Sequence, residues 1–277
     1  MALEARGTTR RVLRYVVLVL VAALVLFPIY ATLMAGFKPG TKVLDHPESL
    51  LPVDLTLDTI RDAWDTGNLG RYLVNSFVMS VAITIGQVIT SLLAAYAFAF
   101  LRFPLRNTLF LVFLATLLVP AEATILINRE TIQTWGWIDS YQALIVPFVA
   151  TAFGTFLIRQ VFLTLPTDLR EAASLDGLGH LAFLREVAAP LARPTIAAFA
   201  LFSFLAAYNQ YLWPLVVTND PDYRTVQIGL KSLAAANLDQ INLVMAGTVI
   251  AFVPILVILL IFQRQLIRGL TAGAVKG

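Results

Sequence analysis

Long apolar runs alternate with short polar segments along this chain, and no stretch shows the pattern of a β-strand. A helix of about twenty apolar residues is long enough to cross the hydrocarbon core of a bilayer, because each residue rises about 1.5 Å. The chain has six such runs, near residues 12–34, 72–101, 107–127, 142–163, 194–217 and 243–263. The pattern therefore predicts an all-α integral membrane protein with six transmembrane helices.

The first run could instead be a signal peptide, because Arg10, Arg11 and Arg14 precede it. Its apolar part is longer than a signal sequence needs, and no clear small-residue cleavage site follows, so a transmembrane helix is favoured. The expected organisation is an N-terminal segment at 1–11, a first span at 12–34, an outer loop at 35–71 and a core at 72–277. Within the loop we expect one short helix around Leu57–Trp64.

Composition supports a membrane location. Of the 277 residues, 58% are hydrophobic and 13% are charged, whereas soluble domains have about 25% charged residues. There is no cysteine, which excludes disulfides, cysteine-based zinc sites and thiol catalysis. The two histidines, His46 and His180, lie far apart without ligand spacing, so no metal site is expected.

The basic residues predict the orientation. Inner segments of a membrane protein are enriched in Lys and Arg. With the N-terminus inside, thirteen of the 20 Lys and Arg residues fall in inner segments, and acidic residues gather in the first outer loop. We therefore expect a multi-pass protein with both termini in the cytoplasm.

The segment 165–190 is unusually polar and separates the fourth and fifth apolar runs. Thr167 is a plausible N-cap, and acidic residues in the next turn suit the positive end of a helix. Gly177 can adopt the left-handed conformation that ends this helix. Asp176 then either caps a second short helix around Leu181–Ala189 or is held for a partner.

The small side chains of Ala172 and Ala173 would let this helix approach another surface closely, with Arg170 and Glu171 at the rim of the contact. A docking site for a partner protein is one interpretation. The alternative is an amphipathic connector that rests on lipid headgroups, although its mixed charge fits this less well.

The letters "EAASLDG", followed after a spacer by "PLARP", resemble the EAA loop of membrane subunits of ATP-binding-cassette (ABC) importers. The segments "TFLIRQVFLTLP", "FSFLAAYNQYLWPLVV" and "FQRQLIRGLTAGAVKG" resemble the carbohydrate-uptake, maltose-type branch. The resemblance covers most of the chain from Arg71 onward and implies the type I importer permease fold. Two positions depart from the pattern: Tyr208 stands where tryptophan is usual, and Leu105 where glycine is common.

In that family the loop forms a coupling helix that sits in a groove of the cytoplasmic ATPase. The resemblance implies the following ATPase-coupling residues: Arg170, Glu171, Ala172, Ala173, Asp176, Gly177 and Gly179. The chain lacks the GxxxxGK[ST] phosphate loop, so ATP and Mg²⁺ are expected on partner subunits, with no cofactor in this chain.

The resemblance also implies the setting and the partners. They are a bacterial plasma or inner membrane with its lipid, a homologous permease forming a heterodimer, two ABC ATPases and an extracytoplasmic solute-binding (lipo)protein, without nucleic acid. Similarity to the second permease of the glycerol-3-phosphate (Ugp) importers implies glycerol-3-phosphate or a glycerophosphodiester such as glycerophosphocholine as solute. The alternative is a disaccharide or oligosaccharide of the maltose or trehalose type.

Polar residues at membrane depth tend to face a cavity or the bundle interior. The candidate pathway residues are Asn75, Glu122, Asn209, Gln210, Tyr211 and Trp213. Their amides could bind hydroxyl groups and their aromatic rings could stack on a solute. The alternative is hydrogen bonding between helices and anchoring at the interface. Glu122 is either water-exposed at the outer mouth or attracts a cation beside aromatic rings.

Two other classes of protein fit less well. An ion-coupled carrier would need acidic residues deep in its spans and inverted repeats. An intramembrane enzyme would need a catalytic pair at membrane depth, which the sequence lacks. The chain is therefore expected to be a permease subunit and not an enzyme.

Overall fold

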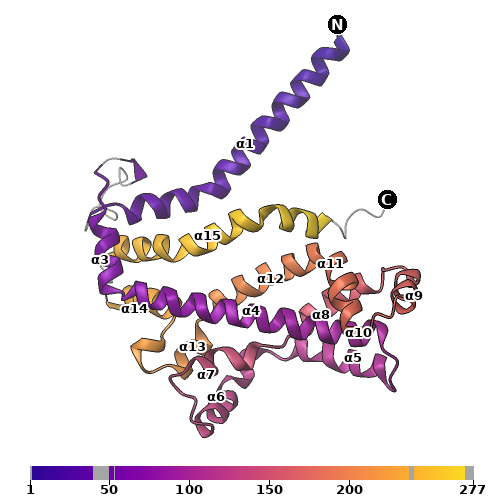
Figure 1. Ribbon diagram of the computed structural model, residues 1–277. Coiled ribbons are helices and arrows are strands. Elements are labelled where there is room, and N and C mark those ends of the chain that lie inside the picture. The colour runs from indigo at the N-terminus through magenta and orange to yellow at the C-terminus, as the bar shows by residue number, and fades with distance from the viewer. Residues whose placement is uncertain (1, 40–49, 53, 237–239, 272–277) are drawn as a thin grey trace. The chain divides into compact units, whose positions relative to one another are not determined.

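The computed structural model describes residues 2–39, 50–52, 54–236 and 240–271, and it describes side chains except at 2–10, 121 and 264–271. The rest of the outer loop, with His46, and the final tail lie outside these residues. The regular elements of the described chain are all helices (Figure 1). The chain divides into two compact units: unit 1 comprises 1–70 and 229–253, and unit 2 comprises 71–228 and 254–277.

Unit 1 contains α1 (Ala2–Gly36), α3 (Asp58–Thr66), most of α14 (Val226–Ala236) and the first part of α15 (Ile241–Thr271). The carbonyl oxygen of Lys38 joins these elements, because it accepts hydrogen bonds from Thr59 Oγ1 at 2.8 Å and Asn242 Nδ2 at 3.0 Å. The short helix expected in the outer loop is present as α3. Helix α14 was not predicted.

Unit 2 is built around α4 (Leu69–Phe100), which packs with α8 (Ala152–Phe162) and α12 (Arg193–Tyr208). The three helices meet at Gly154. A Cβ atom at Gly154 would lie only 2.2 Å from Phe199 Cζ and 2.5 Å from Ser91 Oγ. Small residues at such crossings let membrane helices approach closely.

Three of the predicted spans are broken, which corrects the expectation of continuous helices at 107–127, 142–163 and 194–217. Helix α5 (Arg106–Ala115) and its 3₁₀ extension to Leu118 stop before Pro120, and the chain turns by 83° into α6 (Ile125–Thr134). Helix α7 (Tyr141–Ile145) with its 3₁₀ extension meets α8 at 41°. Helix α12 ends at Tyr208, and α13 (Leu212–Val217) follows.

Proline explains these breaks. Pro120 and Pro147 lie at the first two, and Pro214 lacks the N–H that would bond to the carbonyl of Gln210 in a continuous helix. At the second break, side chains of α4 donate hydrogen bonds to carbonyl groups near the break. Gln87 Nε2 donates to the carbonyl of Phe148 at 2.8 Å, and Thr90 Oγ1 donates to the carbonyl of Val149 at 2.7 Å. Such pairing is required at membrane depth, where water is not available to exposed carbonyls.

Three described helical segments are long and apolar enough to cross a membrane alone: Arg11–Gly36, Leu69–Phe100 and Ile241–Gln263. Three bent pairs pass the same test together, which allows up to six spans. One of these pairs joins His180–Leu191 to α12 and so takes in the polar segment rather than α13. The number of six spans therefore stays a prediction.

Candidate functional site

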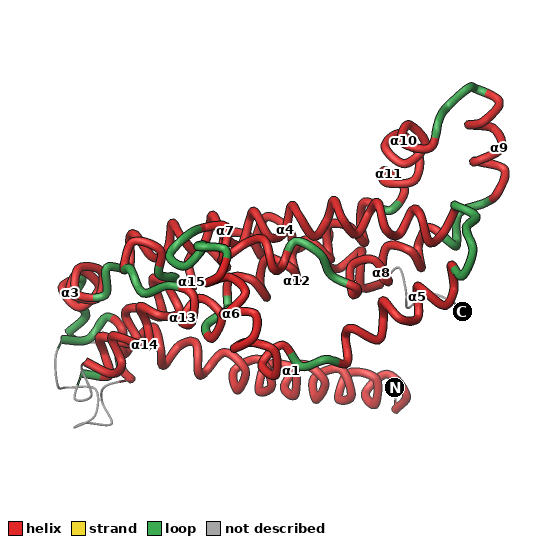
Figure 2. The backbone as a smooth tube through the Cα atoms, turned by 90° about the horizontal axis from the view of Figure 1, so that it is seen from below, coloured by secondary structure: helices red, strands yellow, loops and turns green. Residues whose placement is uncertain are grey.

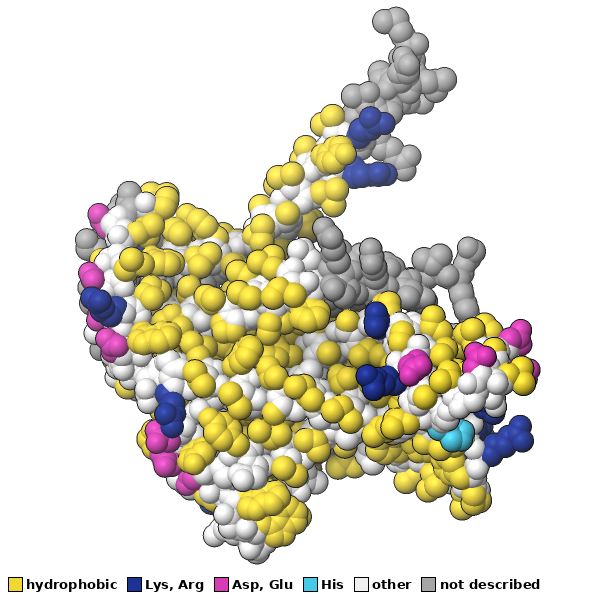
Figure 3. All heavy atoms as spheres, in the orientation of Figure 1, with side chains coloured by type: hydrophobic (Ala, Val, Ile, Leu, Met, Phe, Trp, Pro, Cys, Tyr) yellow, Lys and Arg dark blue, Asp and Glu magenta, His cyan; other side chains and the backbone are white. Residues whose placement is uncertain are grey.

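The polar segment forms a series of short helices that connects α8 to α12. It contains α9 (Thr167–Leu175), α10 (His180–Phe183), a π-helical turn (Leu184–Ala188) and α11 (Ala189–Leu191). Figures 1 and 2 both show α9 and α10 at the Phe100 end of α4. Charged side chains gather over this end of unit 2, whereas hydrophobic side chains cover much of the surface over α4 (Figure 3).

The ends of α9 differ in part from the sequence expectation. The helix starts at Thr167 itself after Pro166, which fixes an extended backbone there, so Thr167 is not the N-cap and makes no capping bond. Asp176 does not cap α10 either, because Gly179 occupies that position without a side-chain cap. Asp168 lies in the first turn as expected.

Gly177 ends α9 as predicted. It has φ of +78°, and its N–H bonds to the carbonyl of Ser174 while the N–H of Leu178 bonds to that of Ala173. This pair of bonds is the Schellman arrangement, in which glycine is favoured because a left-handed conformation has no steric cost for it. A Cβ at Gly177 or Gly179 would have no neighbouring atom within 4 Å, so only Gly177 is constrained, and by its backbone.

The polar segment has an inner and an outer face. Ala173 is only 5% exposed and joins a buried cluster with Phe183 and with Ile158 and Phe162 of α8. This corrects the expectation that both alanines face a partner, because Ala173 faces the protein's own core. Arg170, Glu171, Ala172, Asp176, Gly177 and Gly179 are exposed. Leu175, which the sequence analysis did not single out, is 90% exposed.

Two hydrogen bonds tie this segment to the end of α4. Tyr96 Oη and His180 Nδ1 are 2.8 Å apart, and Arg170 Nη1 donates to the carbonyl of Phe100 at 3.2 Å. The rings of Tyr96 and Phe183 also pack together, with centroids 6.4 Å apart. A displacement of the segment would therefore be transmitted to α4 and α8.

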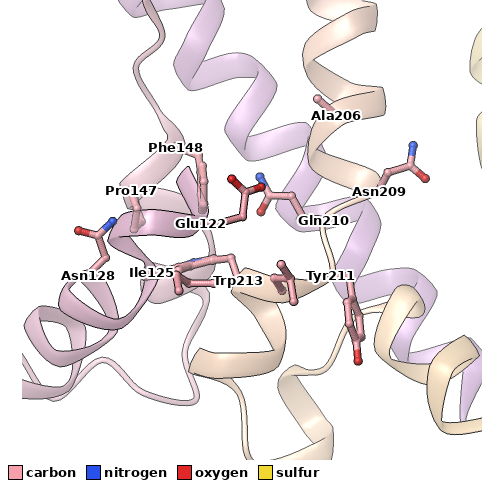
Figure 4. A pocket seen from close by; sticks show the side chains of 11 residues that line it. Glu122, Ile125, Asn128, Pro147, Phe148, Ala206, Asn209, Gln210, Tyr211 and Trp213 are labelled. Carbon is pink, nitrogen blue, oxygen red and sulfur yellow. The ribbon is translucent and has the colours of Figure 1, made fainter. Parts of the chain in front are cut away.

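A cavity of about 460 Å³ lies where the broken helices of unit 2 meet (Figure 4). It brings together five of the six predicted pathway residues: Glu122, Asn209, Gln210, Tyr211 and Trp213. Asn128 of α6, a further polar residue expected at membrane depth, also lines it, as does Phe148 of the turn before α8, which was not predicted. Pro120 and Pro147 were the available signals, because helix breaks at membrane depth commonly border a cavity.

Glu122 and Gln210 are two of the polar residues that line the cavity. Figure 4 shows their side chains pointing toward one another. Gln210 Oε1 is buried without a hydrogen-bond partner, and Glu122 has no ion pair among the described residues. Trp213 instead uses its Nε1–H on the carbonyl of Ala143 at 2.9 Å. The described residues that line the cavity include no Lys or Arg.

Asn75 lies elsewhere and is fully buried. Its Nδ2 donates to the carbonyls of Asp222 and Arg224, each at 2.8 Å, and its Oδ1 accepts from Tyr141 Oη at 2.6 Å. Because its amide is already satisfied, Asn75 holds the loop after α13 against α4. This corrects its assignment to the solute pathway and agrees with the alternative of hydrogen bonding between helices.

The cavity and the polar segment are separated along α4. Met79 and Ile83 pack beside Trp213, whereas Tyr96 contacts His180. Ile83 and Tyr96 are thirteen residue steps apart along α4, which corresponds to roughly 20 Å of helix. Within the described chain, no group of three or more His, Asp or Glu side chains could hold a metal ion.

Broken helices surround a cavity beside α4, and a polar segment packs farther along α4. This arrangement defines a transport permease. The chain belongs to the family of binding-protein-dependent transport system inner membrane components, whose sequence model matches residues 87–272. It is therefore a permease subunit of an ABC transporter, which excludes the ion-coupled carrier and the intramembrane enzyme.

Curated relatives align over almost the whole chain. The chain is 37% identical over 264 residues to the sn-glycerol-3-phosphate transport system permease protein UgpE of Yersinia pestis, covering 92% of this chain and 94% of the relative. It is 38% identical to the proteins of the same name from Pectobacterium atrosepticum, over 264 residues, and Brucella abortus, over 265 residues, with the same coverage.

A solved structure shows the same fold. It is the crystal structure of a bacterial ABC transporter involved in the import of the acidic polysaccharide alginate. The match has a TM-score of 0.79 and 23% identity, and it covers 91% of this chain and 95% of the other.

Proposed function

We propose that this chain forms half of the translocation pathway for sn-glycerol-3-phosphate or a glycerophosphodiester such as glycerophosphocholine. A homologous permease forms the other half as a heterodimer partner, an extracytoplasmic binding protein delivers the solute, and two separate ABC ATPases with ATP and Mg²⁺ supply the energy. Both termini and the polar segment lie in the cytoplasm of a bacterial cell.

One observation carries the coupling role. The polar segment packs its inner face into the core of unit 2 and leaves Glu171, Ala172 and Leu175 exposed. Exposed leucine beside charged residues suits a protein contact with an apolar centre and a polar rim. Closure of the ATPases would then push the segment, and the bonds from Arg170 and His180 would pass the movement to α4. Packed helices respond to such a push by switching between discrete arrangements.

Replacement of Gly177 tests the coupling. Gly177→Val puts a β-branched residue at a φ of +78°, which such residues avoid, so the end of α9 must rearrange. We expect reconstituted vesicles to lose at least about tenfold in solute uptake, equivalent to about 1.4 kcal/mol, while ATP hydrolysis is retained. Leu181→Val is the control, because Leu181 is exposed, lies in the helical α10 and is not one of the coupling residues. Equal uptake by both variants would contradict the coupling role.

The cavity favours a solute with a cationic group. Glu122 supplies a carboxylate, Gln210 a buried amide oxygen without a partner, and Tyr211 and Trp213 aromatic rings, while no basic residue lines the cavity. A quaternary ammonium is attracted by carboxylates and aromatic faces, whereas a phosphate monoester would be repelled. Among the candidate solutes, glycerophosphocholine fits this set of groups.

Glu122→Gln tests this preference. We expect uptake of glycerophosphocholine to fall about fivefold, because neutralising the carboxylate removes an attraction of order 1 kcal/mol. Uptake of sn-glycerol-3-phosphate should stay equal or rise. A parallel loss for both solutes would contradict a role for Glu122 in selecting the cationic group. Stimulation of the wild-type ATPase by maltose or trehalose on the binding protein, without either glycerophosphate, would favour the sugar alternative.

A further inference from the structure

The turn between α4 and α5 carries an unusual concentration of positive charge. We call Arg102, Arg106, Arg159 and Arg170 the arginine cluster. Three members donate to carbonyls at the end of α4: Arg159 Nε to Phe98 at 3.2 Å, Arg170 Nη1 to Phe100 at 3.2 Å, and Arg106 Nη1 to Leu101 at 3.1 Å. Cations at a helix C-terminus are stabilising, which explains part of the cluster.

Most N–H donors of the arginine cluster remain unused by the bonds to the carbonyls at the end of α4. Each guanidinium has five N–H donors, and each of these three arginines uses one in the bonds just described. Arg102 is exposed and makes no hydrogen bond or ion pair with the described residues. Among the described residues, Arg71 and Asp222 form the ion pair of the structure. No described carboxylate therefore forms an ion pair with the arginine cluster.

A hollow of about 440 Å³ opens at this turn. Arg102 and Arg106 line it together with Asn107 and Thr108, so its wall combines two guanidinium groups with an amide and a hydroxyl. These groups are suited to a phosphate, because guanidinium binds phosphate oxygens through two parallel N–H bonds.

Apolar side chains continue from the hollow along α5. Leu109 and Val112 are exposed and lie three residues apart in α5, so they share one face of the helix, and the exposed Leu105 precedes them at the N-cap. The turn joins the 32-residue apolar helix α4 to α5, and therefore lies where the chain leaves and re-enters the membrane. An occupant with a phosphate head and an apolar tail would satisfy both parts of this surface.

We propose that the hollow at Arg102 and Arg106 binds the headgroup phosphate of an anionic phospholipid, with an acyl chain along Leu105, Leu109 and Val112. Phosphatidylglycerol represents the class. The arginine cluster forms no ion pair with a described carboxylate and is therefore complementary to an anionic headgroup, and basic pockets at the cytoplasmic ends of membrane helices bind such lipids. This site is distinct from the solute cavity, and the proposal does not depend on which solute the importer carries.

Native mass spectrometry of the complete importer tests the proposal. The purified complex in mild detergent is titrated with phosphatidylglycerol and, separately, with phosphatidylcholine of the same acyl chains. We expect tighter binding of phosphatidylglycerol. Arg102→Gln should weaken that binding about fivefold, since one basic residue near a membrane surface contributes about a factor of five. Arg102→Lys should retain most of the binding, because its charge remains.

Arg185→Gln is the matched control, because Arg185 is also exposed, lies on the polar segment and does not line the hollow. It should bind phosphatidylglycerol like the wild type. Equal binding of the two lipids, unchanged binding in Arg102→Gln, or an equal loss in Arg185→Gln would overturn the proposal. Displacement by millimolar inorganic phosphate would show a simple anion site and would also overturn it. Binding to the isolated permease pair but not to the complete importer would show that a partner protein covers the cluster, with the same consequence.

Discussion

At the scale of single residues, the contacts of this protein explain several sequence features that composition alone leaves open. Leu105 stands where related permeases commonly have glycine, and it has φ of 58°, a conformation that glycine adopts without cost. At Gly154 the constraint is different, because the crowded space around it, and not its backbone conformation, excludes a side chain. The backbone conformation is therefore the constraint at position 105, whereas close packing is the constraint at position 154.

Gly154→Ala should destabilise the protein. Phe199 is 2% exposed and packs at a tilt against Phe153 with ring centroids 6.3 Å apart, so it cannot move aside without opening the core. Overpacking of this kind typically costs about 1–3 kcal/mol. We expect a lower midpoint of thermal unfolding in detergent. Gly179→Ala adds the same methyl group in open space, and an equal decrease for the two variants would contradict the packing argument.

At the scale of helices, the sequence predicts where the helices lie better than whether each helix is continuous. All six apolar runs coincide with helices of the structure, because hydropathy reports which residues avoid water. The breaks within three runs depend on prolines and on donors from other helices, such as Gln87 and Thr90, which hydropathy does not report. For this reason the polar cavity residues between α12 and α13 were predicted, whereas Phe148 was not.

Thr90→Val should weaken the junction of α7 and α8. It removes the hydroxyl that donates to the carbonyl of Val149 while keeping the shape of the side chain. A buried carbonyl left without a partner costs about 1–3 kcal/mol. The thermal unfolding midpoint should therefore fall, and Thr90→Ser should restore most of it because the hydroxyl returns.

Thr248→Val is the control for this prediction. The Thr248 hydroxyl donates to the carbonyl of Val244 within its own helix, where the backbone already supplies a partner. We expect little change in unfolding midpoint for this variant. If Thr90→Val were equally mild, the junction would not depend on the donor from α4.

At the scale of the whole molecule, the proposed coupling role requires the cavity and the polar segment to communicate. Both belong to unit 2 and both contact α4, at levels separated by roughly 20 Å of helix. The sequence indicated which residues belong to each region, and it left hydrogen bonding between helices open for Asn75, but it did not predict that Ala173 faces inward or which carbonyls Asn75 bonds. Those roles follow from tertiary contacts, which a single sequence does not contain.

The natural absence of cysteine allows a direct test of the proposed orientation. Ser174→Cys on α9 and Thr134→Cys at the end of α6 both introduce a thiol at an exposed position. With the polar segment inside, a membrane-impermeant maleimide should label Thr134→Cys on intact cells and Ser174→Cys only in inverted vesicles. Binding of the ATPases should then protect Ser174→Cys by at least about tenfold, because an interface core excludes water, while Thr134→Cys stays reactive. Labelling of Ser174→Cys on intact cells, or the same reactivity with and without ATPases, would place the segment away from the energy source and refute its coupling role.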